Sequence, residues 1–167
     1  MKCLPLAVGL CRAWVVSGAW AEEPYVATPI AGKVTASEGP VVLPDGTLYF
    51  CSLTSTTGET FDRNVRGSIG VLRPGAAETE VFMDLPEGVR LNGMRATPWG
   101  TILAANSVGK SIVEINPETK ELTTYFKFPD EGDRPNDLTI LKDGTLFVSL
   151  PPAAIWKVWK NEAGEVE

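Results

Sequence analysis

The amino-acid sequence predicts an all-β protein made of repeated antiparallel units. It contains 16 glycines and 13 prolines, and only 8% of its residues are aromatic, which favours many tight turns between short strands over a few long helices. A gapless internal repeat supports the same fold class, because it recurs three times around the glycines Gly46, Gly100 and Gly144. We therefore expect short β-strands wherever the repeat extends.

Each copy of the repeat has the pattern of a β-hairpin. A short apolar stretch leads to a Pro-Asp-Gly, Pro-Trp-Gly or Lys-Asp-Gly turn and then to a β-rich stretch, in residues 38–50, 92–104 and 136–148. A second hairpin follows in the first two copies, and the third copy begins one at 155–159. A stack of independent hairpins is the alternative, but isolated hairpins are marginally stable. Four antiparallel strands in about 45 residues predict the blades of a β-propeller.

The repeat also predicts which side chains lie together. Glu38, Asn92 and Asn136 each precede the anchoring glycine of their copy by eight residues. Since the first strand of every blade lines the central channel, these three residues should meet at one mouth of that channel. Asp45 and Asp143 stand in the turns at the opposite end of the strand, where we interpret them as turn formers.

One carboxylate and two amide oxygens are ligands suited to a hard divalent cation such as Ca²⁺, Mg²⁺ or Mn²⁺. The alternative is that Glu38, Asn92 and Asn136 are polar caps that bind the loop backbone. The chain contains no histidine, which excludes a Ser-His-Asp triad, a His-Cys pair and any His-ligated zinc site within it. A metal bound by these residues must therefore be held by oxygen atoms.

The first 21 residues have the pattern of a secretory signal peptide, with an Ala-x-Ala site that predicts cleavage after Ala21. A buried N-terminal strand or helix is the alternative, because Arg12 interrupts the apolar stretch. Arg12 separates two apolar runs, at 3–10 and 13–21, and both are much shorter than the roughly 20 residues of a membrane span. Loss of Lys2 and Arg12 leaves 13 basic against 21 acidic residues, a net charge of −8, which disfavours nucleic acid as a partner. We expect a secreted or periplasmic protein.

Four segments carry a resemblance to a known family. In order, they are Ser-Glu-Gly-Pro at 37–40, Pro-Asp-Gly-Thr-Leu-Tyr-Phe at 44–50, Leu-Asn-Gly-Met-Arg at 91–95 and Arg-Pro-Asn-Asp at 134–137. Together they resemble the gluconolactonase/regucalcin-like family of six-bladed β-propellers. The resemblance runs from about Ser37 to the C-terminus, so residues 22–167 are expected to be the N-terminal half of such a propeller, with about three blades.

The resemblance implies a single divalent cation on the propeller axis, held by a glutamate, asparagines and a later aspartate. Glu38 matches the glutamate, and Asn92 and Asn136 match asparagines that bind the metal or the substrate. Ca²⁺ is the favoured ion, with Mg²⁺, Mn²⁺ or Zn²⁺ as alternatives. The later aspartate, which is also the expected base, would lie beyond Glu167, so the catalytic base is not identified here and this chain alone is expected to be inactive.

Three residues are candidates for substrate binding. Some members of the family carry Glu-His in the second blade where this chain has Asn106-Ser107, so Asn106 marks a position where a substrate contact would be altered. The connection at 53–67 should return to the channel mouth and roof the site, which would bring Arg63 or Arg66 towards a hydroxylated or anionic substrate. A solvated loop is the alternative.

The expected function is that of a divalent-metal-dependent hydrolase that opens a sugar lactone or a related small ester. The alternative is a non-catalytic propeller module that binds Ca²⁺ or a partner, because many propellers use their blades as recognition surfaces. Open blade edges in a half-ring also predict self-association. We expect no nucleic-acid or membrane partner.

Overall fold

The structure is a computed structural model of the chain, and it describes residues 28, 30, 37–129, 134–152 and 154–166. The predicted signal peptide at 1–21 lies outside the described residues, as does most of the N-terminal stretch before Ser37. In the described part of the chain, no helix has the length and apolar character needed to cross a membrane.

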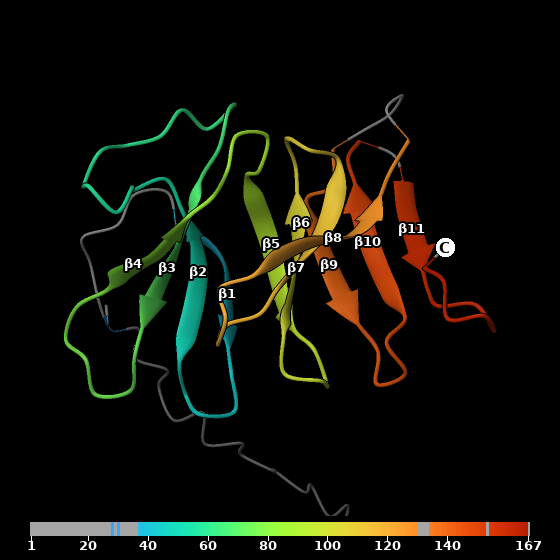
Figure 1. Cartoon of the computed structure of the whole chain (residues 1–167), viewed down its shortest axis with the longest axis horizontal. Coiled ribbons are helices and arrows are strands. Elements are labelled where there is room, and N and C mark those ends of the chain that lie inside the picture. The colour runs from blue at the N-terminus through green and yellow to red at the C-terminus, as the bar shows by residue number, and fades with distance from the viewer. Residues whose placement is uncertain (1–27, 29, 31–36, 130–133, 153, 167) are drawn as a thin grey trace, which may run out of the picture.

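Three antiparallel sheets lie side by side (Figure 1). The first contains β1 (Glu38–Val42), β2 (Leu48–Ser52), β3 (Ser68–Leu72) and β4 (Glu80–Asp84). The second contains β5 (Leu91–Ala96), β6 (Ile102–Asn106), β7 (Ser111–Ile115) and β8 (Leu122–Lys127). The third contains β9 (Asp137–Ile140), β10 (Leu146–Leu150) and β11 (Ala154–Val158). Neighbours in each sheet follow one another in the chain, which confirms the predicted all-β fold with two complete blades and an incomplete third.

The turns that predicted the repeat close the first hairpin of each sheet. Gly46, Gly100 and Gly144 have φ angles of 84°, 90° and 89°, in the left-handed region that favours glycine. The Asp45 carboxylate accepts hydrogen bonds from the Thr47 backbone N–H and hydroxyl at 2.9 and 2.8 Å. These bonds hold the pKa of Asp45 below its ordinary value. The turn-forming role predicted for Asp45 is therefore confirmed.

The strand β6 of the middle sheet is buried on both faces, which explains its apolar sequence. All five residues of β6 are buried. Because successive side chains of a strand point to opposite faces, Ile102 and Ala104 enter the core shared with the first sheet, whereas Leu103 and Ala105 enter the core shared with the third. A strand buried in this way reads as a continuous apolar run rather than as an alternating one.

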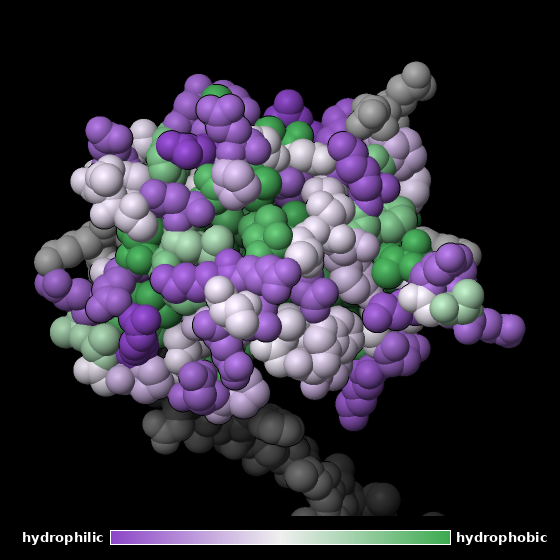
Figure 2. Space-filling view, in the orientation of Figure 1, coloured by the Kyte–Doolittle hydropathy of each residue, from purple (hydrophilic) through white to green (hydrophobic). Residues whose placement is uncertain are grey.

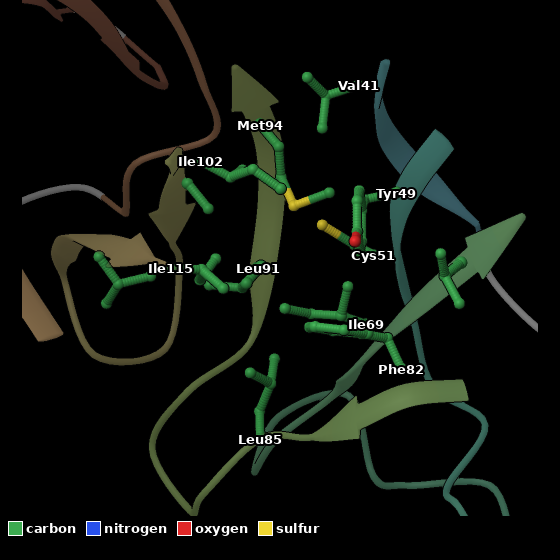
Figure 3. Close-up of a cluster of buried hydrophobic side chains, with 13 residues drawn as sticks. Val41, Tyr49, Cys51, Ile69, Phe82, Leu85, Leu91, Met94, Ile102 and Ile115 are labelled. Carbon is green, nitrogen blue, oxygen red and sulfur yellow. The ribbon is translucent and has the colours of Figure 1, made fainter. Parts of the chain in front are cut away.

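The larger core fills the space between the first two sheets. Figure 3 shows Tyr49, Cys51 and Ile69 of the first sheet facing Leu91 and Met94 of the second. The Tyr49 ring also meets the Phe82 ring edge to face, with centroids 5.1 Å apart. Figure 2 shows apolar residues in the middle of this view, beside a band of hydrophilic residues that crosses it, with further hydrophilic residues around the outside. Inter-sheet packing of this kind fixes the strands relative to one another.

The third sheet has one covered and one open face. Leu146, Val148 and Leu150 of β10 are buried in the second core. On the other side, Phe147 and Ile155 remain 37% and 70% exposed. An exposed apolar sheet face favours contact with another surface, which agrees with the predicted self-association without testing it.

Candidate functional site

The three residues that the repeat singles out lie at one end of the innermost strands. Glu38 is the first residue of β1, Asn92 is the second residue of β5, and Asn136 immediately precedes β9. Both β1 and β5 have a register shift at this end, the first between Glu38 and Val41 and the second between Leu91 and Met94. Bulges of this kind redirect side chains and often stand next to functional sites.

Arg90 links the three residues into one network. Its Nη1 donates a hydrogen bond of 2.7 Å to the Asn92 Oδ1, and its Nη2 lies 3.7 Å from the Glu38 Oε2. The Asn92 Nδ2 in turn donates to the Asn136 Oδ1 at 2.9 Å. The Arg90 side chain is 15% exposed and that of Glu38 is 44% exposed, so the ion pair stands at the boundary between protein and solvent. The predicted convergence of Glu38, Asn92 and Asn136 therefore occurs, with a guanidinium among them.

Close backbone contacts hold this network in place. A side chain at Gly39 would collide with the carbonyl group of Asn92, and one at Gly93 would collide with Asp137. The Gly93 N–H donates to the Asn136 carbonyl oxygen at 2.8 Å, and the Cys51 thiol donates to the Asn92 carbonyl oxygen at the same distance. Burial raises the pKa of Cys51, so this thiol stays neutral beneath the site. The glycine that follows each site residue in the first two sheets lets the innermost strands approach closely.

Asn106 and Ser107 position Arg90. The Asn106 Oδ1 accepts the backbone N–H groups of Arg90 and Gly109 at 3.1 Å, and its Nδ2 donates to the Gly88 carbonyl and the Ser111 hydroxyl at 3.2 Å. The Ser107 N–H and hydroxyl both donate to the Arg90 carbonyl. Asn106 is 3% exposed, and these four hydrogen-bond partners all belong to the protein itself. Its predicted substrate contact stays a prediction, while the structure gives it a role in holding Arg90.

The connection at 53–67 is ordered by hydrogen bonds. The Asp84 carboxylate accepts the Thr56 backbone N–H and hydroxyl at 2.9 and 2.7 Å, and the Gly88 N–H donates to the Val65 carbonyl. Figure 1 shows this loop at the end of the first sheet opposite the Gly46 turn. The Arg66 guanidinium stacks on the Phe61 ring of the same loop, 4.1 Å from its centroid.

An open pocket of about 540 Å³, which we call the mouth pocket, lies at this end of the sheets. The described residues that line it are Arg63, Asn64, Arg90, Asn92, Ser107, Lys110, Arg134, Pro135, Asn136 and Pro151. Arg63 thus lies where the sequence predicted it, and Arg66 is not among the lining residues. Glu38 lines a second pocket, which shares Asn136 with the mouth pocket. The ion pair of Arg95 and Asp137, whose charged atoms are 3.2 Å apart, lines this second pocket as well.

The donor set fits a hard divalent cation by type. Glu38, Asn92 and Asn136 offer one carboxylate and two amide oxygens within one network, whereas Ca²⁺ takes six to eight oxygen ligands. Among the described residues, no three or more His, Cys, Asp or Glu side chains form a group that could hold a metal ion. A cation here would therefore depend on the two amides and on further ligands, and it would compete with Arg90 for the Asn92 oxygen.

Sequence reasoning missed Arg90, Lys110 and Arg134. A signal for Arg90 was present, because it immediately precedes β5 and stands two residues before Asn92. Arg134 also stands two residues before its asparagine, Asn136. Lys110 had no comparable signal, since it reaches the pocket through the turn between β6 and β7.

No protein-family model matches the sequence, and no curated protein matches it. Solved structures do resemble the fold. A virginiamycin B lyase from Staphylococcus aureus is 17% identical with a TM-score of 0.56, and the alignment covers 78% of this chain and 40% of that one. A gluconolactonase from Xanthomonas campestris is 15% identical with a TM-score of 0.57, covering 80% and 47% of the two chains. One chain in the structure of a nidogen/laminin complex is 14% identical to this chain with a TM-score of 0.56, and the alignment covers 80% of this chain and 48% of that one.

These similarities show the fold and not the activity, since the identities are low. The neighbours include both gluconolactonases and a lyase, and they support the prediction of a partial β-propeller. The chain spans less than half the length of the three structures named above.

Proposed function

We propose that this chain forms part of a lactone hydrolase that opens a sugar lactone or a related small ester at the channel mouth. The observation that carries the proposal is the network of Glu38, Arg90, Asn92 and Asn136 at the ends of three innermost strands, beside a pocket large enough for a sugar. The fold-level similarity to gluconolactonases supports it.

Glu38, Asn92 and Asn136 would hold one divalent cation, Ca²⁺ in the first instance, with Mg²⁺, Mn²⁺ or Zn²⁺ as alternatives. When bound, such an ion polarises a lactone carbonyl and lowers the barrier to attack by water. Asn92 and Asn136 also line the mouth pocket, where their amides can orient substrate hydroxyls. Arg90 presents several N–H donors in the same pocket, and Asn106 and Ser107 fix its backbone. The base would be an acidic residue outside these 167 residues.

The second candidate is a non-catalytic module that binds Ca²⁺ or a protein partner through its blades. The similarity to a structure of a nidogen/laminin complex favours it, because that complex contains a propeller-like fold in an assembly of proteins. The two candidates differ in one respect, since only the hydrolase requires turnover.

The test compares lactone hydrolysis by matched variants. This chain, and a form of the protein that carries further blades, would be assayed on glucono-δ-lactone in a pH-stat, with Ca²⁺ or with a chelator. We expect hydrolysis in the longer form, its loss on chelation, and its loss in Glu38→Gln, since that substitution removes the carboxylate and preserves shape. Asp45→Asn at the far turn is the control and should retain full activity. Equal losses from the two variants, or no hydrolysis by the longer form, would contradict the hydrolase and favour the binding module.

We also propose that the protein acts outside the cytoplasm, because residues 1–21 have the pattern of a signal peptide. Protein recovered from the periplasm or medium should begin at Glu22, as N-terminal sequencing would show. Recovery of the chain only in the cytoplasm and beginning at Met1 would contradict this proposal.

A further inference from the structure

The mouth pocket differs in charge from the molecule that contains it. The chain has a formal net charge of −6. Among the described residues that line the pocket, four are cationic and none is acidic, the cations being Arg63, Arg90, Lys110 and Arg134. A concave site lined by one sign of charge concentrates ligands of the opposite sign. The described lining of the pocket is therefore positively charged, although the whole chain carries a net negative charge.

The four cations come from separate connections that meet at one end of the sheets. Arg63 belongs to the loop between β2 and β3, and Lys110 ends the turn between β6 and β7. Arg90 precedes β5, and Arg134 precedes β9. Arg90 already interacts with Glu38 and Asn92. Arg63 and Arg134, in contrast, form no ion pair with any residue that the structure describes. Within the part of the chain that the structure describes, no acidic side chain therefore occupies these two exposed guanidinium groups at the rim.

The turn that carries Lys110 is held in an uncommon backbone conformation. Lys110 has a φ angle of 48°, in the left-handed region that residues other than glycine seldom adopt. Its carbonyl accepts the Phe128 N–H at 2.9 Å, and the preceding Gly109 leaves no room for a Cβ against Asn106 and Gly88. Positions of this kind persist where the surrounding structure fixes them and are common at ligand sites. The packing of the turn therefore fixes the backbone of Lys110 in the wall of the pocket.

We propose that the mouth pocket binds a sugar-sized ligand that carries a carboxylate or a phosphate. The anionic group would lie against Arg63 and Arg134 at the rim, and the hydroxyl groups would meet the amides of Asn92 and Asn136. This combination fits the polar lining, in which amide and hydroxyl groups stand among the cations. The inference rests on the proposed function only in taking the mouth pocket as the substrate site, and it narrows the substrate to an anionic sugar or its lactone.

The test uses three sugars that differ only at carbon 6. D-glucose is neutral, D-glucuronate carries a carboxylate, and D-glucose 6-phosphate carries a phosphate. Calorimetric titration of this chain at low salt should show at least one anionic sugar binding about tenfold more tightly than glucose, with the preference shrinking as salt is added. Arg63→Gln and Arg134→Gln should each weaken binding of the anionic sugar about fivefold, and should weaken binding of glucose less than that.

Arg73→Gln is the matched control, because Arg73 is an exposed arginine that pairs with Glu80 and does not line the mouth pocket. It makes the same change in net charge and should leave all three affinities unchanged. Equal binding of the three sugars, no binding at all, or equal losses from Arg73→Gln and Arg63→Gln would overturn the proposal. Inorganic phosphate is titrated as well, and binding as tight as that of glucose 6-phosphate would overturn the part assigned to the hydroxyl groups.

The outcome separates this inference from the proposed hydrolase. If the anionic sugars bind as expected but the longer form hydrolyses no lactone, the proposed ligand class is supported and the proposed hydrolase activity is contradicted. If neutral glucono-δ-lactone is hydrolysed while the anionic sugars bind no more tightly than glucose, the proposed hydrolase activity is supported and the proposed preference for anions is contradicted.

Discussion

Removal of the Asn106 side chain should destabilise the protein through the loop that carries Arg90. Asn106→Ala deletes four hydrogen bonds to Arg90, Gly109, Gly88 and Ser111, which are 3.1 to 3.2 Å long. An internal hydrogen bond contributes about 0.5–1.5 kcal/mol net, and these bonds are at the long end of the normal range, so we expect a loss of about 2–4 kcal/mol in the free energy of unfolding. That is a large part of the typical stability of a domain.

The loss can be measured by urea unfolding followed by tryptophan fluorescence. With an m-value of about 2 kcal/mol/M, the midpoint should fall by about 1–2 M urea. Asn64→Ala is the control, since Asn64 is exposed and its side chain forms no hydrogen bond with the described residues. It should shift the midpoint very little. A loss below about 0.5 kcal/mol for Asn106→Ala, comparable to that of the control, would refute the role given to its hydrogen bonds.

Three further outcomes follow from packing, charge and exposure. Leu103→Ala removes a fully buried side chain and should lower the free energy of unfolding by about 2–5 kcal/mol. Leu141→Ala is the control at an exposed position and should lower it little. Similar losses from the two variants would contradict the burial of β6 on both faces. The backbone N–H and hydroxyl of Thr47 hold the pKa of Asp45 below its ordinary value, so this stabilisation is present above about pH 4 and is lost as the pH falls further. Thr47→Val removes the hydroxyl donor and should raise the pKa of Asp45 in an NMR titration, and an unchanged pKa would contradict the role of that hydroxyl. Sedimentation of this chain alone should show oligomers that Ile155→Lys reduces, and a monodisperse wild-type monomer with a sharp thermal transition would argue against an open sheet face.

The fold could be predicted because local chemistry repeats along the chain. The turns at Gly46, Gly100 and Gly144 need left-handed backbone, and each is followed by a β-rich stretch, so strand and turn signals agree at every copy. The shared register then placed Glu38 and the two asparagines at one end of the strands. That inference needs only the rotation that relates successive blades.

The surroundings of the site were less predictable because they depend on contacts between distant connections. Arg63 and Arg66 are three residues apart in one polar loop, yet one lines the mouth pocket and the other stacks on Phe61. Asn106 ends a fully buried strand, and its four internal partners lie on both sides of it in the chain. The sequence pattern gives no sign of how these loops pack against one another. Residue spacing therefore predicts the strands and the residues at their ends, but it does not predict how the loops pack.

The position of the cation tests the central claim most directly. A crystal of the longer form grown with Ca²⁺ would be examined by anomalous diffraction at a wavelength where calcium scatters. We predict one peak about 2.3–2.6 Å from the oxygen atoms of Glu38, Asn92 and Asn136, with Arg90 released from Asn92. An anomalous map with no peak at this site, and Arg90 still bound to Asn92, would contradict the account.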